Sequence, residues 1–135
     1  MPMPRRLVFL LRSLLALVLA IVAIPAVNLA GAWLSERVFG LPPGGTLRLA
    51  VDLFWVLAAG CAAAWLLVET AVAAKTAHTW MLFAIYLAVG VYGVTAMGSD
   101  FPVWFTVGFV VLLPAQAWLG RWLAWGRRRN SRPPP

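Results

Sequence analysis

The sequence has few of the residues from which soluble enzymes build their sites. It contains one cysteine, one histidine and four acidic residues among 135, and only 11% of its residues are charged. The single cysteine, Cys61, excludes an internal disulfide and a multi-cysteine metal or redox site. The single histidine, His78, excludes paired axial histidine ligands to haem. With no Gly-rich phosphate loop and no activated nucleophile either, we expect no metal, no cofactor and no enzyme activity.

Apolar residues are abundant instead. They make up 63% of the chain and gather in four long runs, at about residues 7–30, 49–69, 80–97 and 103–124. A helix needs about 20 apolar residues to cross a bilayer, and runs of this length without two-residue alternation favour helices over barrel strands. The sequence therefore predicts an all-α membrane protein. Its four transmembrane helices form an antiparallel bundle in a single domain, residues 1–126.

The segments between the runs carry turn and breaker signals. Residues 42–45 are two prolines followed by two glycines, which a helix does not readily cross. Gly98, Ser99 and Asp100 precede Pro102, a pattern typical of a tight turn into a new helix. The longest connection, residues 31–45, mixes apolar and charged residues, so we expect a short helix lying at the membrane interface there.

Basic residues give the orientation. With a cytoplasmic N-terminus, nine of them lie inside and two outside, which fits the positive-inside rule. We therefore expect a multi-pass protein of the bacterial cytoplasmic (inner) membrane with both termini inside. An alternative is that the basic start and first apolar run, followed by Ala30, Gly31 and Ala32, form a cleaved signal peptide. The inside set is Arg5, Arg6, Arg12, Lys75, Arg121, Arg127, Arg128, Arg129 and Arg132, and the outside set is Arg37 and Arg48.

The last stretch of the chain predicts lipid contact at the cytoplasmic face. Residues 127–135 form a basic tail ending in three prolines, which we expect to be disordered. Basic residues beside a membrane attract anionic headgroups, and tryptophans prefer the same level. We expect these residues to anchor the chain to lipid rather than to bind nucleic acid. The expected headgroup anchors are Arg127, Arg128, Arg129, Trp118, Trp122 and Trp125.

Small residues indicate where helices meet. Within lipid, helices associate by close contact between small side chains, because no hydrophobic force drives them together. Ala59 with Ala63 and Gly60 with Ala64 form two small pairs spaced by four residues in the second run. These four residues predict a helix at the centre of the bundle. They equally fit contact with a second copy of the chain, as a homodimer, or with another membrane protein.

Four polar residues in or near the spans are the candidate functional positions: Glu69, Gln116, Tyr86 and Asp52. Burying such groups in lipid is costly, so they are functional candidates by default. Asp52 follows Arg48 by four residues, which predicts a local ion pair. We expect a small, non-enzymatic accessory or interaction subunit. The alternative is a small transporter or channel working as a homo-oligomer, with these four residues lining its path.

Overall fold

The computed structural model describes residues 5–70, 75–97 and 99–130, and these residues form four helices. They are α1 (Arg5–Arg37), α2 (Thr46–Thr70), α3 (Lys75–Met97) and α4 (Val103–Asn130). Each contains a stretch long and apolar enough to cross a membrane. The expectation of four such helices is therefore confirmed, and the chain is a multi-pass membrane protein.

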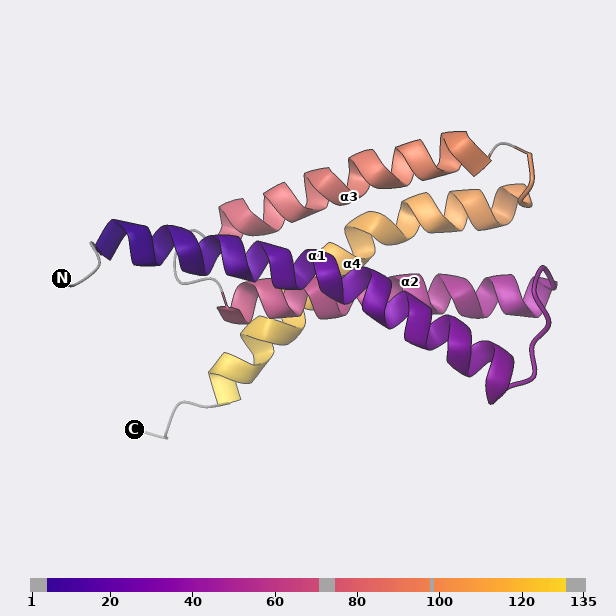
Figure 1. The fold of residues 1–135 in the computed structure, drawn as a ribbon, viewed down its shortest axis with the longest axis horizontal. Helices are drawn as coiled ribbons and strands as arrows, with labels where there is room; N and C mark the ends of the chain where they lie inside the picture. Colours follow the sequence, from indigo (N-terminus) through magenta and orange to yellow (C-terminus); the bar gives the residue numbers. More distant parts are fainter. Residues whose placement is uncertain (1–4, 71–74, 98, 131–135) are drawn as a thin grey trace.

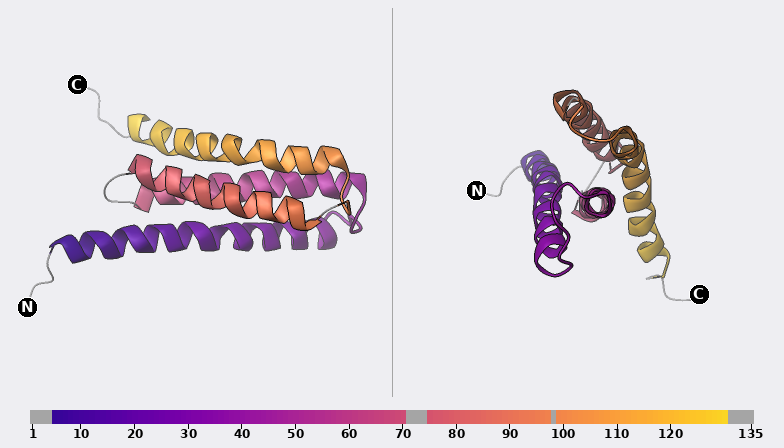
Figure 2. Two further views of the ribbon diagram at one scale, coloured as in Figure 1. Left: turned by 90° about the horizontal axis from the view of Figure 1, so that it is seen from above. Right: turned by 90° about the vertical axis from the view of Figure 1, so that its right-hand side faces the viewer.

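The helix α2 occupies the centre of the molecule. It packs along α1 on one side and α4 on the other, while α3 rests mainly on α4 (Figure 2). In Figure 1, α1 begins and α4 ends towards the left, where α2 ends and α3 begins. The helices α1 and α3 scarcely touch. The bundle is consequently closed around α2 but open between α1 and α3.

The helices extend beyond the expected bounds at several ends: α2 begins at Thr46 instead of residue 49, and α3 begins at Lys75 instead of residue 80. The helix α1 continues to Arg37, so residues 31–37 belong to it and no separate interfacial helix follows. The helix α4 reaches Asn130, so residues 127–130, which we predicted as part of a disordered tail, are helical; residues 131–135 lie outside the described part. Hydropathy locates the part of a helix that lies in lipid, whereas backbone hydrogen bonding continues until a residue stops it.

A glycine stops α1. Gly40 has a φ of 63°, a conformation that residues with a Cβ rarely adopt. The Leu41 amide then donates back to the Ser35 carbonyl, six residues earlier, at 2.9 Å, which closes the turn that follows α1. This turn brings the Leu41 carbonyl to the start of α2, where it becomes part of a polar network described below.

The helix α4 contains Pro114 at its middle and bends there. Proline removes one backbone hydrogen bond and its ring clashes with the preceding turn, so a helix kinks at this residue. In Figure 1 the two halves of α4 run in different directions. On both sides of the bend α4 packs against α2: Gly108 lies against Leu53 in the first half, and Gly120 lies against Ala64 in the second half.

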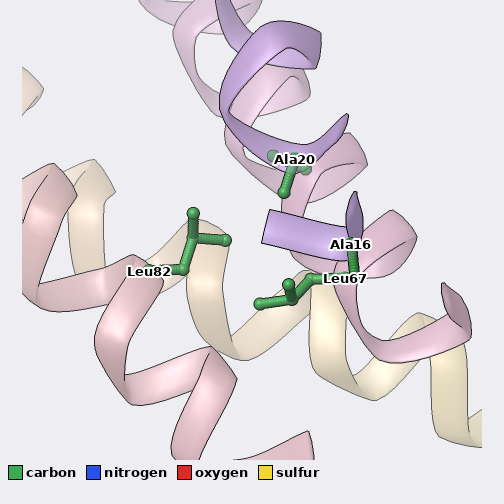
Figure 3. Close-up of a cluster of buried hydrophobic side chains, with 5 residues drawn as sticks. Ala16, Ala20, Leu67 and Leu82 are labelled. Atoms are coloured by element: carbon green, nitrogen blue, oxygen red, sulfur yellow. The ribbon is translucent and has the colours of Figure 1, made fainter. Parts of the chain in front are cut away.

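One apolar cluster joins three helices near the end where α1 begins. Ala16 and Ala20 of α1, Ala63 and Leu67 of α2, and Leu82 of α3 are all buried in it. Figure 3 shows Ala16, Ala20, Leu67 and Leu82 of this cluster on the facing sides of their helices. The alanines allow α1 to approach α2 closely. This cluster closes the gap between α1 and α3 at that level, and the gap opens beyond it.

Candidate functional site: a cavity at mid-membrane

A cavity of about 320 Å³ lies among the four helices next to this cluster. Ile24 and Tyr86 pack against the cluster and also line the cavity, so the cluster forms its floor. Nearly all of the wall is apolar. Its lining comes from α1 (Ile21, Ile24, Pro25, Asn28), α2 (Val56, Gly60), α3 (Ile85, Tyr86, Val89, Gly90) and α4 (Phe109, Leu113, Gln116).

The deepest polar residue in the wall is Gln116, one of the predicted candidates. Its side chain is 3% exposed and lies against Gly60 of α2. A Cβ at Gly60 would overlap the Gln116 amide, so only glycine leaves room for it. Among the described residues this amide has no hydrogen-bond partner, and it keeps some exposure to the cavity, unlike the completely buried Tyr86 hydroxyl. Gln116 therefore brings an unpaired donor and acceptor into an apolar cavity.

Tyr86, a second predicted candidate, faces the same cavity from α3. Its hydroxyl is buried and has no hydrogen-bond partner within the described part of the chain. An unpaired buried hydroxyl costs about 1–3 kcal/mol relative to a paired one. The structure thus brings Tyr86 and Gln116 together from two helices, each with unused hydrogen-bonding capacity.

Asn28 is the third polar residue of the wall, and it is partly satisfied. Its amide nitrogen donates to the Ile24 carbonyl one turn earlier in α1, at 3.0 Å. Asn28 also lines a second, shallower cavity of about 460 Å³ between α1 and α2, as do Pro25 and Val56. The two cavities are therefore neighbours that share one wall.

Exposure along the wall shows where the cavity opens. Gly60, Gly90, Leu113 and Gln116 are buried, whereas Ile21 on α1 is 39% exposed and Val89 on α3 is 63% exposed. The deep wall thus belongs mainly to α2 and α4, and the rim belongs to α1 and α3. Both rim residues lie within the membrane-crossing stretches of their helices. The cavity consequently opens sideways between α1 and α3, within the apolar stretches of these helices.

Asp52 does not line the first cavity but lines the neighbouring one, towards the end where α1 stops. Arg48 Nε donates to Asp52 Oδ1 at 2.9 Å, so the predicted ion pair is confirmed. The other two nitrogens of the guanidinium donate to the backbone carbonyls of Leu41, at 3.2 Å, and Ala32, at 3.3 Å. Arg48 therefore ties α2 to α1 and to the turn between them.

Glu69 and the last helical residues, 127–130, lie at the opposite end of the bundle from Asp52. Glu69 is exposed, takes part in an interaction near the end of α2, and does not line the mid-membrane cavity. The side chains of Arg127, Arg128 and Arg129 lie outside the described part. Trp118, Trp122 and Trp125 are exposed on α4, and the Arg121 guanidinium lies 4.1 Å from the centre of the Trp125 ring.

The small residues of α2 are occupied by the chain's own helices. Ala59, Gly60, Ala63 and Ala64 are all buried. Gly60 faces Gln116, and Ala64 faces Gly120, where an added Cβ would lie 2.7 Å from the Cys61 carbonyl oxygen. This surface of α2 is thus an internal packing face.

Several contributors were missed by the sequence analysis. The cavity is also lined by apolar residues, among them Ile21, Val56, Ile85 and Val89. In the sequence these residues look the same as apolar residues that face lipid. Ser35 was also missed: its hydroxyl oxygen accepts from Trp55 Nε1 at 3.1 Å, while Gly31 leaves room for the Trp55 ring. Gly31 and Ser35 are four residues apart and so lie on the same face of the helix. This spacing was the available sequence signal that the face could receive a large side chain with a hydrogen-bond donor.

These features define a multi-pass α-helical membrane protein with a lateral cavity. Comparison with protein-family models, curated proteins and solved structures finds no match to this chain.

Proposed function

We propose that the chain is a small, non-enzymatic accessory or interaction subunit of the bacterial cytoplasmic membrane. In this proposal its four helices cross the bilayer as an antiparallel bundle with both termini cytoplasmic. The distribution of basic residues supports that orientation. Anionic headgroups then contact the end of α4, and a partner contacts a lateral face of the bundle.

The outward face of α3 is the observation that carries this proposal. Leu82 and Gly90 of α3 are buried towards the bundle, while Ala84 and Ala88 are exposed on its other side. Alanines four residues apart let a second helix approach closely in lipid. The helix α3 also has few contacts to α1 and α2, so this face is free to receive a helix from another chain.

Co-purification in mild detergent tests the proposal. A membrane protein or a second copy of the chain should remain bound to the wild type, and Ala84→Ile with Ala88→Ile should reduce its recovery at least ten-fold. Ala26→Ile with Ala30→Ile is the matched control, because these alanines have the same spacing and are exposed on α1. A partner that stays bound to the α3 variant, or no partner at all, would contradict the proposal.

The second candidate function is that of a small transporter working as a homo-oligomer. The position of Gln116 on a mid-membrane cavity wall favours it, and Asp52 and Glu69 lie towards the two ends of the central helix. This alternative predicts solute flux in liposomes that Gln116→Leu or Glu69→Gln abolishes. Solute flux in the wild type that either substitution abolishes would support the transporter function and contradict the accessory role.

A further inference from the structure

The mid-membrane cavity has the properties of a binding site rather than of a packing defect. Its volume of about 320 Å³ falls in the range of small-molecule pockets, about 300–1,000 Å³. Such pockets combine a mainly apolar wall with a few polar groups that orient the ligand. Here the polar groups are Tyr86 and Gln116, neither of which has a hydrogen-bond partner among the described residues.

The chemistry of these two residues defines the ligand they would recognise. A tyrosine hydroxyl and a glutamine NH₂ both donate hydrogen bonds. A carbonyl oxygen accepts two such bonds through its lone pairs, and a ring that carries carbonyls on opposite sides can accept one at each. The rest of the wall is apolar and requires an apolar ligand body.

The opening determines the route by which the ligand arrives. The rim at Ile21 and Val89 faces lipid, and the buried cluster around Leu67 and Leu82 closes one end of the cavity. A ligand therefore enters from the bilayer, between α1 and α3, and must itself dissolve in lipid. We propose that this cavity binds a membrane-dissolved molecule with an apolar tail and a carbonyl-bearing ring, of the quinone class.

Two other occupants explain the site less well. A lipid acyl chain has no acceptor and would leave the Tyr86 hydroxyl and the Gln116 amide unpaired. Water needs two to four polar partners for each molecule, and the wall supplies three polar side chains for the whole cavity. A quinone ring offers an acceptor to the Tyr86 hydroxyl and another to the Gln116 NH₂ group, and it fills the apolar space with one molecule.

Binding of a benzoquinone with a decyl tail to the protein in lipid nanodiscs tests the proposal, with empty nanodiscs subtracted for partition into lipid. We expect saturable binding that Tyr86→Phe and Gln116→Leu each weaken about 3- to 10-fold, the loss of one hydrogen bond. Tyr92→Phe is the matched control, because Tyr92 is on the same helix but 74% exposed. Its affinity should equal that of the wild type.

Thermal unfolding without ligand separates binding from structure. The Tyr86 hydroxyl has no partner in the unliganded protein, so Tyr86→Phe should leave the Tm unchanged or raise it while weakening binding. A hydroxyl needed for folding would lower the Tm instead. Equal binding of decylbenzene, unchanged affinity of both variants, or no saturable binding would each overturn the proposal.

Discussion

At the scale of single residues, the polar side chains fall into two groups that differ in what they already bind. The Arg48 guanidinium uses three nitrogens on three acceptors, one carboxylate and two backbone carbonyls. Tyr86 and Gln116 have no protein partner within the described residues. Because an unpaired polar group in an apolar surrounding is costly, the first group stabilises the fold. The second group, Tyr86 and Gln116, lowers the stability of the fold but leaves hydrogen-bonding groups available for a ligand.

Replacing Arg48 should therefore destabilise the bundle. Arg48→Gln removes the ion pair to Asp52 and the bonds to two carbonyls that join α1, its terminal turn and α2. Hydrogen bonds to charged groups contribute about 1.5–3 kcal/mol, and Asp52 is partly exposed, so we expect a loss of about 1–3 kcal/mol in the free energy of unfolding. Unfolding in detergent by denaturant titration measures it.

The exposed Arg37 provides the matched control for this prediction. Arg37→Gln makes the same chemical change at the last residue of α1, where the side chain is exposed, and should alter stability by less than about 0.5 kcal/mol. Asp52→Asn should cost less than Arg48→Gln, because it leaves the two carbonyl bonds in place. Equal stability of the Arg48 and Arg37 variants would show that the network contributes nothing.

At the scale of helices, close approach depends on glycines whose surroundings differ. A Cβ at Gly120 of α4 would lie 2.7 Å from the Cys61 carbonyl oxygen of α2, and this backbone atom cannot turn away as a side chain can. A Cβ at Gly93 of α3 would meet no atom within 4 Å. Both glycines lie inside helices, so alanine brings the same gain in helix propensity at each.

The pair Gly120→Ala and Gly93→Ala isolates helix packing from propensity. Gly120→Ala should force α4 away from α2 and lower the free energy of unfolding by about 1–3 kcal/mol. Gly93→Ala should leave it unchanged or raise it by up to about 1 kcal/mol. Thermal unfolding of both variants in the same detergent gives the comparison. A Gly120→Ala protein as stable as the wild type would mean that α2 and α4 do not pack this closely.

The sequence predicts helices better than it predicts the contacts between them. Four apolar runs give four helices because lipid requires about 20 apolar residues for each crossing. The end of α1 was placed too early because hydropathy falls before the backbone turns at Gly40. Gln116 and Tyr86 stand out as polar residues in apolar runs. Their shared cavity does not, because small-residue spacing does not specify which helices meet or in which register.

At the scale of the whole molecule, the packing is uneven around the central helix. The helices α1 and α4 hold α2 along its length, whereas α3 and α1 meet only near the buried cluster (Figures 1 and 3). Beyond that cluster the molecule has a lateral opening lined by unpaired polar groups. A proposed partner on the outer face of α3 and a ligand between α1 and α3 would therefore both act on the helix with the weakest attachment.

The orientation of this uneven bundle in the membrane can be measured directly. The proposed orientation, which rests on the distribution of basic residues, predicts that the α3–α4 turn lies outside and the start of α3 inside. With Cys61→Ala as background, Ser99→Cys and Thr76→Cys each introduce one thiol at an exposed position on opposite ends of α3. A membrane-impermeant maleimide should label Ser99→Cys in intact spheroplasts, and Thr76→Cys only after lysis. Labelling in the reverse order would place both termini outside and contradict the proposed orientation.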